Sequence, residues 1–206
     1  MKQTGKIGAG NLISFGRYRW RVLEIKDGKA LILTECVVEQ RAYHGVQKQI
    51  TWERSDMREY LNGEFFGAFS AAEQARIMET RITDRDNPWY GGKWGNPTDD
   101  KIFLLSYDEV VRYFGDSGAL ANRSGEDAGV GLPYGDAISD EYDDARRVFD
   151  LDGNEAWWWL RSPGGPRDHT EHDHVTNGSA GDVIFLCGDD IGKKNGGVRP
   201  ALWLRL

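Results

Sequence analysis

The strongest constraint on the fold is a hairpin signal near the start of the chain. Residues 12–25 and 29–38 are two apolar segments with strand character, and Asp27 and Gly28 separate them. An Asp-Gly pair readily adopts the positive φ angles that a two-residue hairpin turn requires. We therefore expect the two segments to form neighbouring antiparallel strands.

A matching strand pattern closes the sequence. Within residues 198–206, Leu202, Leu204 and Leu206 occupy every second position, which predicts that they share one face of a strand. Pro200 lacks an amide donor and belongs at a strand start or edge. Because helical signals occupy the middle of the chain, we expect the two terminal strand regions to share one sheet.

Three helices have start or stop signals in this middle region. The first is predicted over residues 51–61 and ends at Asn62. The second and third begin with Ser-x-x-Glu capping boxes at Ser70 and Ser106, and the third ends at Gly115. Two short strands are also expected, at residues 47–51 and 101–105.

Residues 116–155 are rich in Gly, Asp and Ser and follow no period. Residues 136–155 hold eight carboxylates against two arginines, a net charge of −6 out of −7 for the whole chain. We interpret the segment as a long surface excursion with a solvated acidic face. The alternative is a cation or ligand loop, because residues 150–155 resemble a calcium loop, although the glycine falls too early for an EF-hand.

The overall charge and the lack of long apolar runs exclude some classes of partner. A net charge of −7 disfavours broad binding to nucleic acid or to anionic membranes. The sequence has no apolar signal segment and no run near the roughly 20 apolar residues of a membrane helix. We therefore expect no nucleic-acid partner, no membrane insertion, and a cytoplasmic or virion-associated location.

The cysteines and tryptophans are expected in or near the core. Cys36 and Cys187 each lie in an apolar strand-like run, which favours two buried free thiols; a disulfide is the alternative if their strands are neighbours. Eight tryptophans indicate a core of large rings or an aromatic recognition surface. Of the consecutive Trp157, Trp158 and Trp159, we assign Trp158 to the core, because successive strand residues face opposite sides.

Two motifs carry a resemblance to a known group of proteins. Residues 158–164 (Trp-Trp-Leu-Arg-Ser-Pro-Gly) and 197–202 (Gly-Val-Arg-Pro-Ala-Leu) resemble a family of bacterial and viral domains of unassigned function. Shorter matching segments continue this resemblance in order along nearly the whole chain: residues 15–16 with 20–23, then 31–35, 52–61 and 100–106. That family is similar to the C-type-lectin-like variable proteins of diversity-generating retroelements, and more distantly to the formylglycine-generating enzymes.

The resemblance implies an α+β, C-type-lectin-like fold formed as a single domain over residues 1–206. Its mixed or antiparallel sheet would be joined by the N- and C-terminal strands and accompanied by two to three helices and long loops. Residues 156–206 would be a variable, ligand-binding segment that undergoes massive sequence variation on a fixed scaffold. Glu171 falls outside the codon set that adenine mutagenesis produces and does not fit this pattern.

On this interpretation the segment binds a protein or glycan partner. The candidate ligand-binding residues lie between the two motifs and are Arg167, Asp168, His169, Thr170, His172, Asp173, His174, Asn177, Asp182, Ile184, Leu186, Asp189 and Asp190. Arg161 and Arg199 lie within the motifs themselves, and we expect them to bridge loops to the sheet; contact with a ligand is the alternative role.

The main alternative is metal chemistry. His169, His172 and His174 have the close spacing of zinc or copper ligands, and carboxylates adjoin them. A loop rarely holds such ligands in the right geometry without supporting hydrogen bonds, so we expect no required cofactor, with zinc or calcium as the alternatives. An enzyme or metal protein that uses this cluster is the corresponding alternative function.

Other features favour a binding protein over an enzyme. The sequence has no glycine-rich phosphate loop after a strand and no Gly-x-Ser-x-Gly elbow. Formylglycine-generating enzymes depend on a cysteine pair near the C-terminus, whereas here only Cys187 lies in that region. A structural subunit of a phage or surface assembly is the remaining alternative, with the same surface as an oligomer contact.

Overall fold

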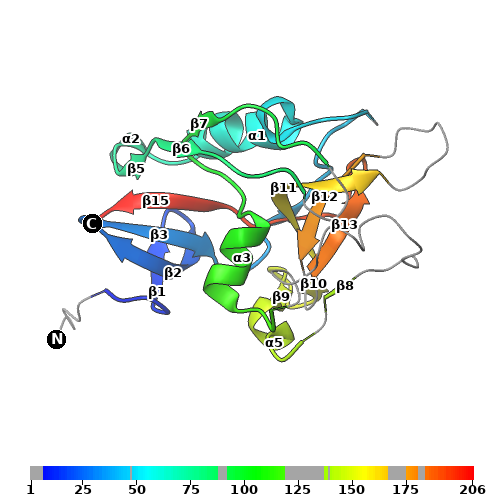
Figure 1. Ribbon diagram of the computed structural model, residues 1–206. Coiled ribbons are helices and arrows are strands. Elements are labelled where there is room, and N and C mark those ends of the chain that lie inside the picture. Colours follow the sequence, from blue (N-terminus) through cyan, green and yellow to red (C-terminus); the bar gives the residue numbers. More distant parts are fainter. Residues whose placement is uncertain are drawn as a thin grey trace.

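The computed structural model describes residues 7–46, 48–87, 92–118, 137–138, 140–166, 175–180 and 184–206. The fold is α+β, with mostly antiparallel strands and short helices (Figure 1). The larger sheets lie on opposite sides of helix α3 in Figure 1. One has five strands, in the order β1 (Leu12–Phe15), β2 (Tyr18–Lys26), β3 (Lys29–Thr34), β15 (Ala201–Arg205) and β5 (Ile77–Met78).

The expected pairing of the terminal strand regions is confirmed. Strand β15 pairs antiparallel with β3, so that Leu202 lies opposite Ile32, and both side chains are fully buried. Pro200 directly precedes β15, as its missing donor predicts. Leu204 is also buried, but Leu206 lies beyond the strand and is 49% exposed.

The N-terminal hairpin is confirmed with one correction. Asp27 and Gly28 have φ angles of 50° and 73° and join β2 to β3. The single strand predicted over residues 12–25 is instead two antiparallel strands, β1 and β2. Gly16 turns the chain between them at a φ of 57°, where a Cβ would lie 2.6 Å from the Phe69 ring, so only glycine suits this corner.

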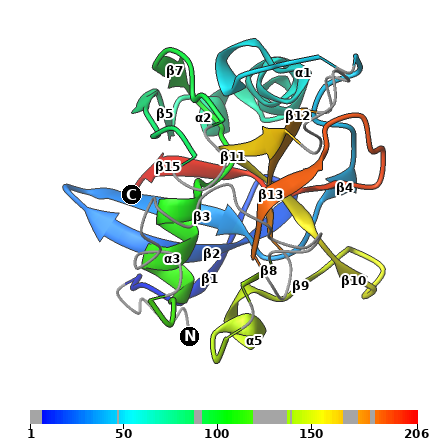
Figure 2. The same ribbon diagram turned by 45° about the vertical axis from the view of Figure 1, so that its right-hand side comes forward.

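The second large sheet has six strands, and β11, β12 and β13 lie side by side in it (Figure 2). Strand β11 pairs with β14 in parallel, whereas the other neighbouring strands of this sheet pair antiparallel. The order is β4 (Glu39–Gln40), β14 (Gly197–Val198), β11 (Trp158–Pro166), β12 (Val175–Ala180), β13 (Ile184–Asp190) and β8 (Ala137–Ile138).

The helix predicted over residues 51–61 is segmented and does not stop at Asn62. A 3₁₀ turn η1 (Trp52–Arg54) is followed by α1 (Asp56–Tyr60), and a π-helical turn η2 (Leu61–Phe65) continues past the expected end. The Asn62 amide donates to the carbonyls of Arg58 at 3.1 Å and Ile102 at 2.9 Å, so it links the helix to a neighbouring segment instead of ending it.

Both capping boxes are confirmed. Ser70 and Glu73 cap α2 (Ala71–Gln74), and Ser106 and Glu109 cap α3 (Tyr107–Phe114). Gly115 ends α3 at a φ of 95°. None of the helices in the described part of the chain is long and apolar enough to cross a membrane.

The short strands around these helices were predicted wrongly. Residues 101–105 form only an isolated bridge from Phe103 to Ala201, and the strand lies just before them, as β7 (Thr98–Asp100) paired with β6 (Thr80–Ile82). Strand β7 is polar, and its alternating buried threonine and aspartate carry no apolar signal. Residues 48–51 form no strand.

The acidic segment contains structure that its composition did not predict. It holds a short α-helix, α5 (Asp143–Arg146), and a short hairpin of β9 (Val148–Phe149) and β10 (Glu155–Ala156). Arg146 is fully buried and pairs with Asp140 and with Asp143 at 2.7 Å. The expectation of a solvated acidic face is therefore wrong for Asp140 and Asp143, which neutralise a buried cation, but it holds for Asp144 and Glu155, whose side chains are 86% and 56% exposed.

The hydrogen bonds around these carboxylates fit structural roles. Burial alone would raise the pKa of Asp140, but the amides of Ser117 and Tyr142 and the Arg146 guanidinium together hold it below its usual value. In the calcium-like loop, Asp150 accepts the backbone amides of Asp152 and Asn154, both at 2.9 Å. That carboxylate closes a turn.

The aromatic core agrees with the assignment of Trp158, and Trp159 is equally buried. Cys36 is a free thiol but is only partly buried, so the expectation of full burial is wrong for it. The alternative of a disulfide is not realised, because Cys36 follows a strand of the five-stranded sheet and Cys187 lies on β13 of the other.

Adjacent arginines test the role of the buried ion pair. Arg146→Ala would leave Asp140, whose side chain is 3% exposed, without its cation. The expected loss in free energy of unfolding is about 3 kcal/mol. Arg147→Ala removes a 40% exposed side chain that pairs at the surface, and is expected to cost under about 1 kcal/mol. Urea denaturation measures the free energy of unfolding of both variants. Equal losses in the two variants would contradict a structural role for the buried pair of Arg146 and Asp140.

Candidate recognition site

The first half of β11 is held by the core on both of its faces. Trp158, Trp159 and Leu160 have no exposed surface. The Trp159 indole donates to the Arg41 carbonyl at 2.9 Å. A Cβ on Gly196 would lie 2.0 Å from the same indole nitrogen, so this glycine permits a close approach of the backbone to Trp159.

Arg161 ties β11 to the start of α3. It is 4% exposed, and its Nη1 donates to the Leu104 carbonyl at 2.6 Å and to Glu109 at 2.5 Å. Glu109 also accepts the Ser106 amide in the capping box, so one carboxylate serves both the helix start and the strand. The expected bridging role of Arg161 is thereby confirmed.

The next residues of β11 are fixed by a second polar group. The Ser162 hydroxyl donates to Asp84 and accepts the Tyr107 amide at 3.0 Å. The Asn87 amide donates to the Pro163 carbonyl at 2.9 Å. Burial raises the pKa of Asp84, and the nearby Arg161 and Ser162 offset this only in part. Residues 158–163 therefore form a rigid strand, which we name the anchored stem.

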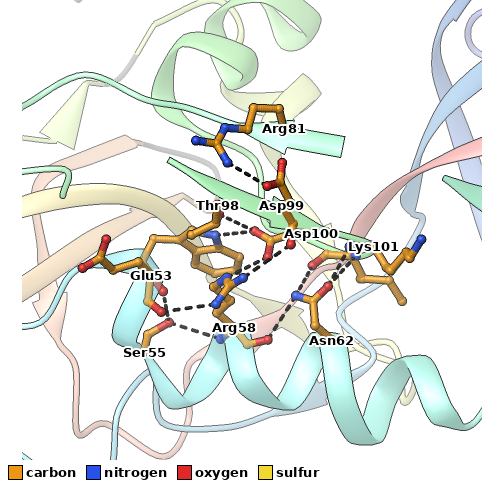
Figure 3. Close-up of polar contacts among 11 residues, drawn as sticks. Glu53, Ser55, Arg58, Asn62, Arg81, Thr98, Asp99, Asp100 and Lys101 are labelled. Atoms are coloured by element: carbon orange, nitrogen blue, oxygen red, sulfur yellow. Dashed lines mark hydrogen bonds and ion pairs between the residues drawn. The ribbon is translucent and has the colours of Figure 1, made fainter. Parts of the chain in front are cut away.

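A buried network beside the stem joins α1 to β7 (Figure 3). Asp100 is 1% exposed and accepts hydrogen bonds from the Trp52 indole at 2.8 Å, from Thr98 at 2.7 Å and from Arg58 at 2.7 Å. The three donors occupy both of its oxygens. This arrangement stabilises the scaffold and offers little to a ligand.

The network reaches the stem through tilted and edge-to-face aromatic contacts. Tyr43 lies between Trp52, at a ring distance of 6.4 Å, and Trp159, at 5.7 Å. Sequence reasoning missed this connection. The spacing of Trp52, Ser55, Arg58 and Asn62 indicated a helix, but nothing local indicated that its partner would be an aspartate 42 residues beyond Arg58.

The candidate ligand-binding residues divide into two groups. Asn177 lies on β12, and the other members of the first group lie on β13: Ile184, Leu186, Asp189 and Asp190. The second group lies outside the described residues and consists of Arg167, Asp168, His169, Thr170, His172, Asp173, His174 and Asp182.

The strand register brings part of the first group together. Asn177 lies directly opposite Asp189, and Thr176 lies opposite Asp190. Ile184 pairs with Ala180 on one side and with Ile138 of β8 on the other. An amide and two acidic residues are thus neighbours on adjacent strands.

The histidine cluster of residues 169–174 lies outside the described part of the chain. Among the residues that the structure does describe, no group of three or more His, Cys, Asp or Glu side chains could hold a metal ion.

The fold and the stem define an α+β protein in which one anchored strand supports β12 and β13; we name these two the outer strands, and the short β8 flanks β13 at the edge of the sheet. Residues 27–206 match the model of the DUF6273 family, described as a domain of unknown function. The chain belongs to this family. No curated protein and no solved structure matches it significantly.

A pair of glycine substitutions tests the packing of the stem. Gly196→Ala forces a Cβ into the Trp159 ring and is expected to lower the free energy of unfolding by about 1–3 kcal/mol. Gly63→Ala, in a helical turn with open space around it, is expected to be neutral or to stabilise by up to about 1 kcal/mol. Thermal and urea unfolding measure the stability of both variants. An unchanged free energy of unfolding in Gly196→Ala would contradict tight packing of the stem against this glycine.

Proposed function

We propose that this chain is a ligand-recognition protein in which β12 and β13, supported by the anchored stem, bind a protein or glycan partner. The observation that carries the proposal is the register that sets Asn177 against Asp189 and Thr176 against Asp190. Carboxylates and amides bind glycan hydroxyls and basic protein groups through directed hydrogen bonds. A fixed support lowers the entropy lost when such groups bind.

The rigid support and the outer strands fit a division of roles. The stem uses buried rings and polar groups that are already paired, whereas β12 and β13 carry the mixed polar and apolar residues of the candidate set. A scaffold that is stabilised elsewhere tolerates substitutions in the strands that it supports.

We further propose that the fold is C-type-lectin-like and that the outer strands are diversified by a retroelement. The antiparallel pairing of β3 with β15 supports the first part, since that fold joins its terminal strands. Inspection of the neighbouring DNA tests the second part. A reverse transcriptase gene beside a near-copy of the last segment is the expected finding, and the absence of both would contradict it.

Substitutions separate recognition from structure. The double substitution Asp189→Ala and Asp190→Ala is expected to change the free energy of unfolding by less than about 0.5 kcal/mol, as for surface sites. It is also expected to abolish binding to ligands that glycan arrays and displayed peptide libraries select with the unaltered chain. Ser162→Ala, in the stem, serves as the control and is expected to cost about 1–3 kcal/mol.

Two outcomes would contradict this function. Strong destabilisation by the acidic substitutions would make the outer strands structural. Stoichiometric zinc or copper in protein purified without a metal-affinity tag would favour a metal protein built on residues 169–174. Light scattering at several concentrations tests whether the same surface is an oligomer contact.

A further inference from the structure

A cleft of about 580 Å³ lies away from the outer strands, between the five-stranded sheet and the α5–β9 segment. The end of α3 closes one side. The described residues that line it all come from segments other than β12 and β13. Its walls are largely apolar and include Val22, Leu23, Phe114, Val148 and Phe149. Phe149 is 47% exposed, so an apolar ring remains accessible to a molecule that enters.

Arg199 contributes a buried guanidinium to this cleft and is only 3% exposed. Its Nε donates to the Thr34 carbonyl at 3.0 Å. The guanidinium lies over the rings of Trp158 at 4.8 Å and Phe114 at 5.5 Å. The Nη1 atom is buried without a hydrogen-bond partner among the described residues. Such a donor is costly to leave unpaired, and an acceptor that reached it would be bound strongly.

The other charges that line the cleft are largely matched in pairs. Arg21 pairs with Glu35 at 2.5 Å, and Arg147 pairs with Asp144 at 2.8 Å and with Glu155, which is not part of the lining, at 3.1 Å. Arg199 forms no ion pair with any residue that the structure describes. Burial lowers the pKa of Arg199 to about 10, so the guanidinium remains charged at neutral pH. The lining therefore has one excess positive charge, in a chain whose net charge is −7.

We propose that this cleft binds a small organic monocarboxylate. Arg199 pairs with the carboxylate, and the apolar walls enclose the hydrocarbon or aromatic body. A guanidinium presents forked donors that match the two oxygens of a carboxylate. A single excess charge balances a monoanion. The carboxylates of Glu35 and Asp144 disfavour a dianion such as phosphate by repulsion.

Matched small molecules test the charge requirement. Isothermal titration calorimetry of the whole chain with 3-phenylpropionate and with octanoate is expected to show saturable binding. The neutral analogue 3-phenylpropanamide is expected to bind at least tenfold more weakly than 3-phenylpropionate. Inorganic phosphate is expected not to bind. Three outcomes would overturn the proposal: equal affinity for the acid and its amide, preferential binding of phosphate, or no binding of either acid up to about 10 mM. The last limit corresponds to a binding free energy weaker than about 3 kcal/mol.

Variants test the location of the site. Arg199→Gln is expected to weaken acid binding at least tenfold. Because Arg199 is buried and its loss can unfold the chain, Ala145→Trp provides a second variant: Ala145 is exposed, lines the cleft, and would block it with a bulky ring. Ala72→Trp, at an exposed position of α2, is the matched control. Loss of binding in Ala145→Trp but not in Ala72→Trp is expected, and unchanged binding in Ala145→Trp would overturn the proposal.

Cys36 supplies a separate readout, since its partly buried thiol also lines the cleft. In a Cys187→Ser background, 3-phenylpropionate is expected to slow alkylation of Cys36 by iodoacetamide at least fivefold at saturation, whereas the amide at the same concentration leaves the rate unchanged. An unchanged rate at a saturating acid concentration would place the bound acid elsewhere and overturn the proposal. None of these measurements involves the outer strands. The proposed recognition function and the proposed carboxylate site are therefore tested independently of each other.

Discussion

The pairing of β3 with β15 is the contact on which the rest of the structure depends. It sets Leu33 against Ala201 and Ile32 against Leu202, and all four side chains are completely buried. Each large apolar side chain buried in this way contributes roughly 1.5–3 kcal/mol. The pair is also a docking point for the middle of the chain, because Phe103 and Ala201 exchange backbone hydrogen bonds at 2.7 and 2.9 Å. Helix α3, which follows Phe103, is thereby positioned against the sheet.

Buried arginines then attach the irregular segments to this core. Arg146 and Arg161 each reach carboxylates and backbone carbonyls from more than one segment. Arginine suits this task because its guanidinium stays charged and offers several donors in a fixed plane. Arg199 differs from these two, since it forms no ion pair with any residue that the structure describes, and its guanidinium lies over the rings of Trp158 and Phe114. We therefore assign Arg199 to the proposed carboxylate site and the other two arginines to the scaffold.

The features that could be predicted from sequence are those decided by neighbouring residues. The turn at Asp27 and Gly28 and the capping boxes at Ser70 and Ser106 depend on local backbone preferences, and all were predicted correctly. The alternation before Leu206 also sufficed to predict a terminal strand. Pairing of the terminal strands followed because few other arrangements would cover an apolar face at each end.

The remainder depends on contacts between distant segments. Composition placed Arg146 in a solvated acidic run, but Asp140 and α5 enclose it. Asn62 resembled a helix stop, yet its amide binds a segment 40 residues away. Strand β7 lacks an apolar pattern because its buried Asp100 is stabilised by hydrogen bonds from other elements. The candidate recognition residues were found through family resemblance, whereas nothing in the local pattern indicated the cleft at Arg199.

The parallel pairing of β11 with β14 has a consequence for how this domain can change over time. Trp158 pairs with Gly197, and the Gly197 amide donates to the Trp157 carbonyl at 3.0 Å. The chain therefore leaves and re-enters the core at adjacent points. An insertion after the stem lengthens a segment whose ends are already held together, and each doubling of a flexible segment of this kind costs only about 0.6 kcal/mol. Added length after the anchored stem therefore costs this fold little, whereas the stem itself, with Trp159 packed against Gly196, has no such freedom.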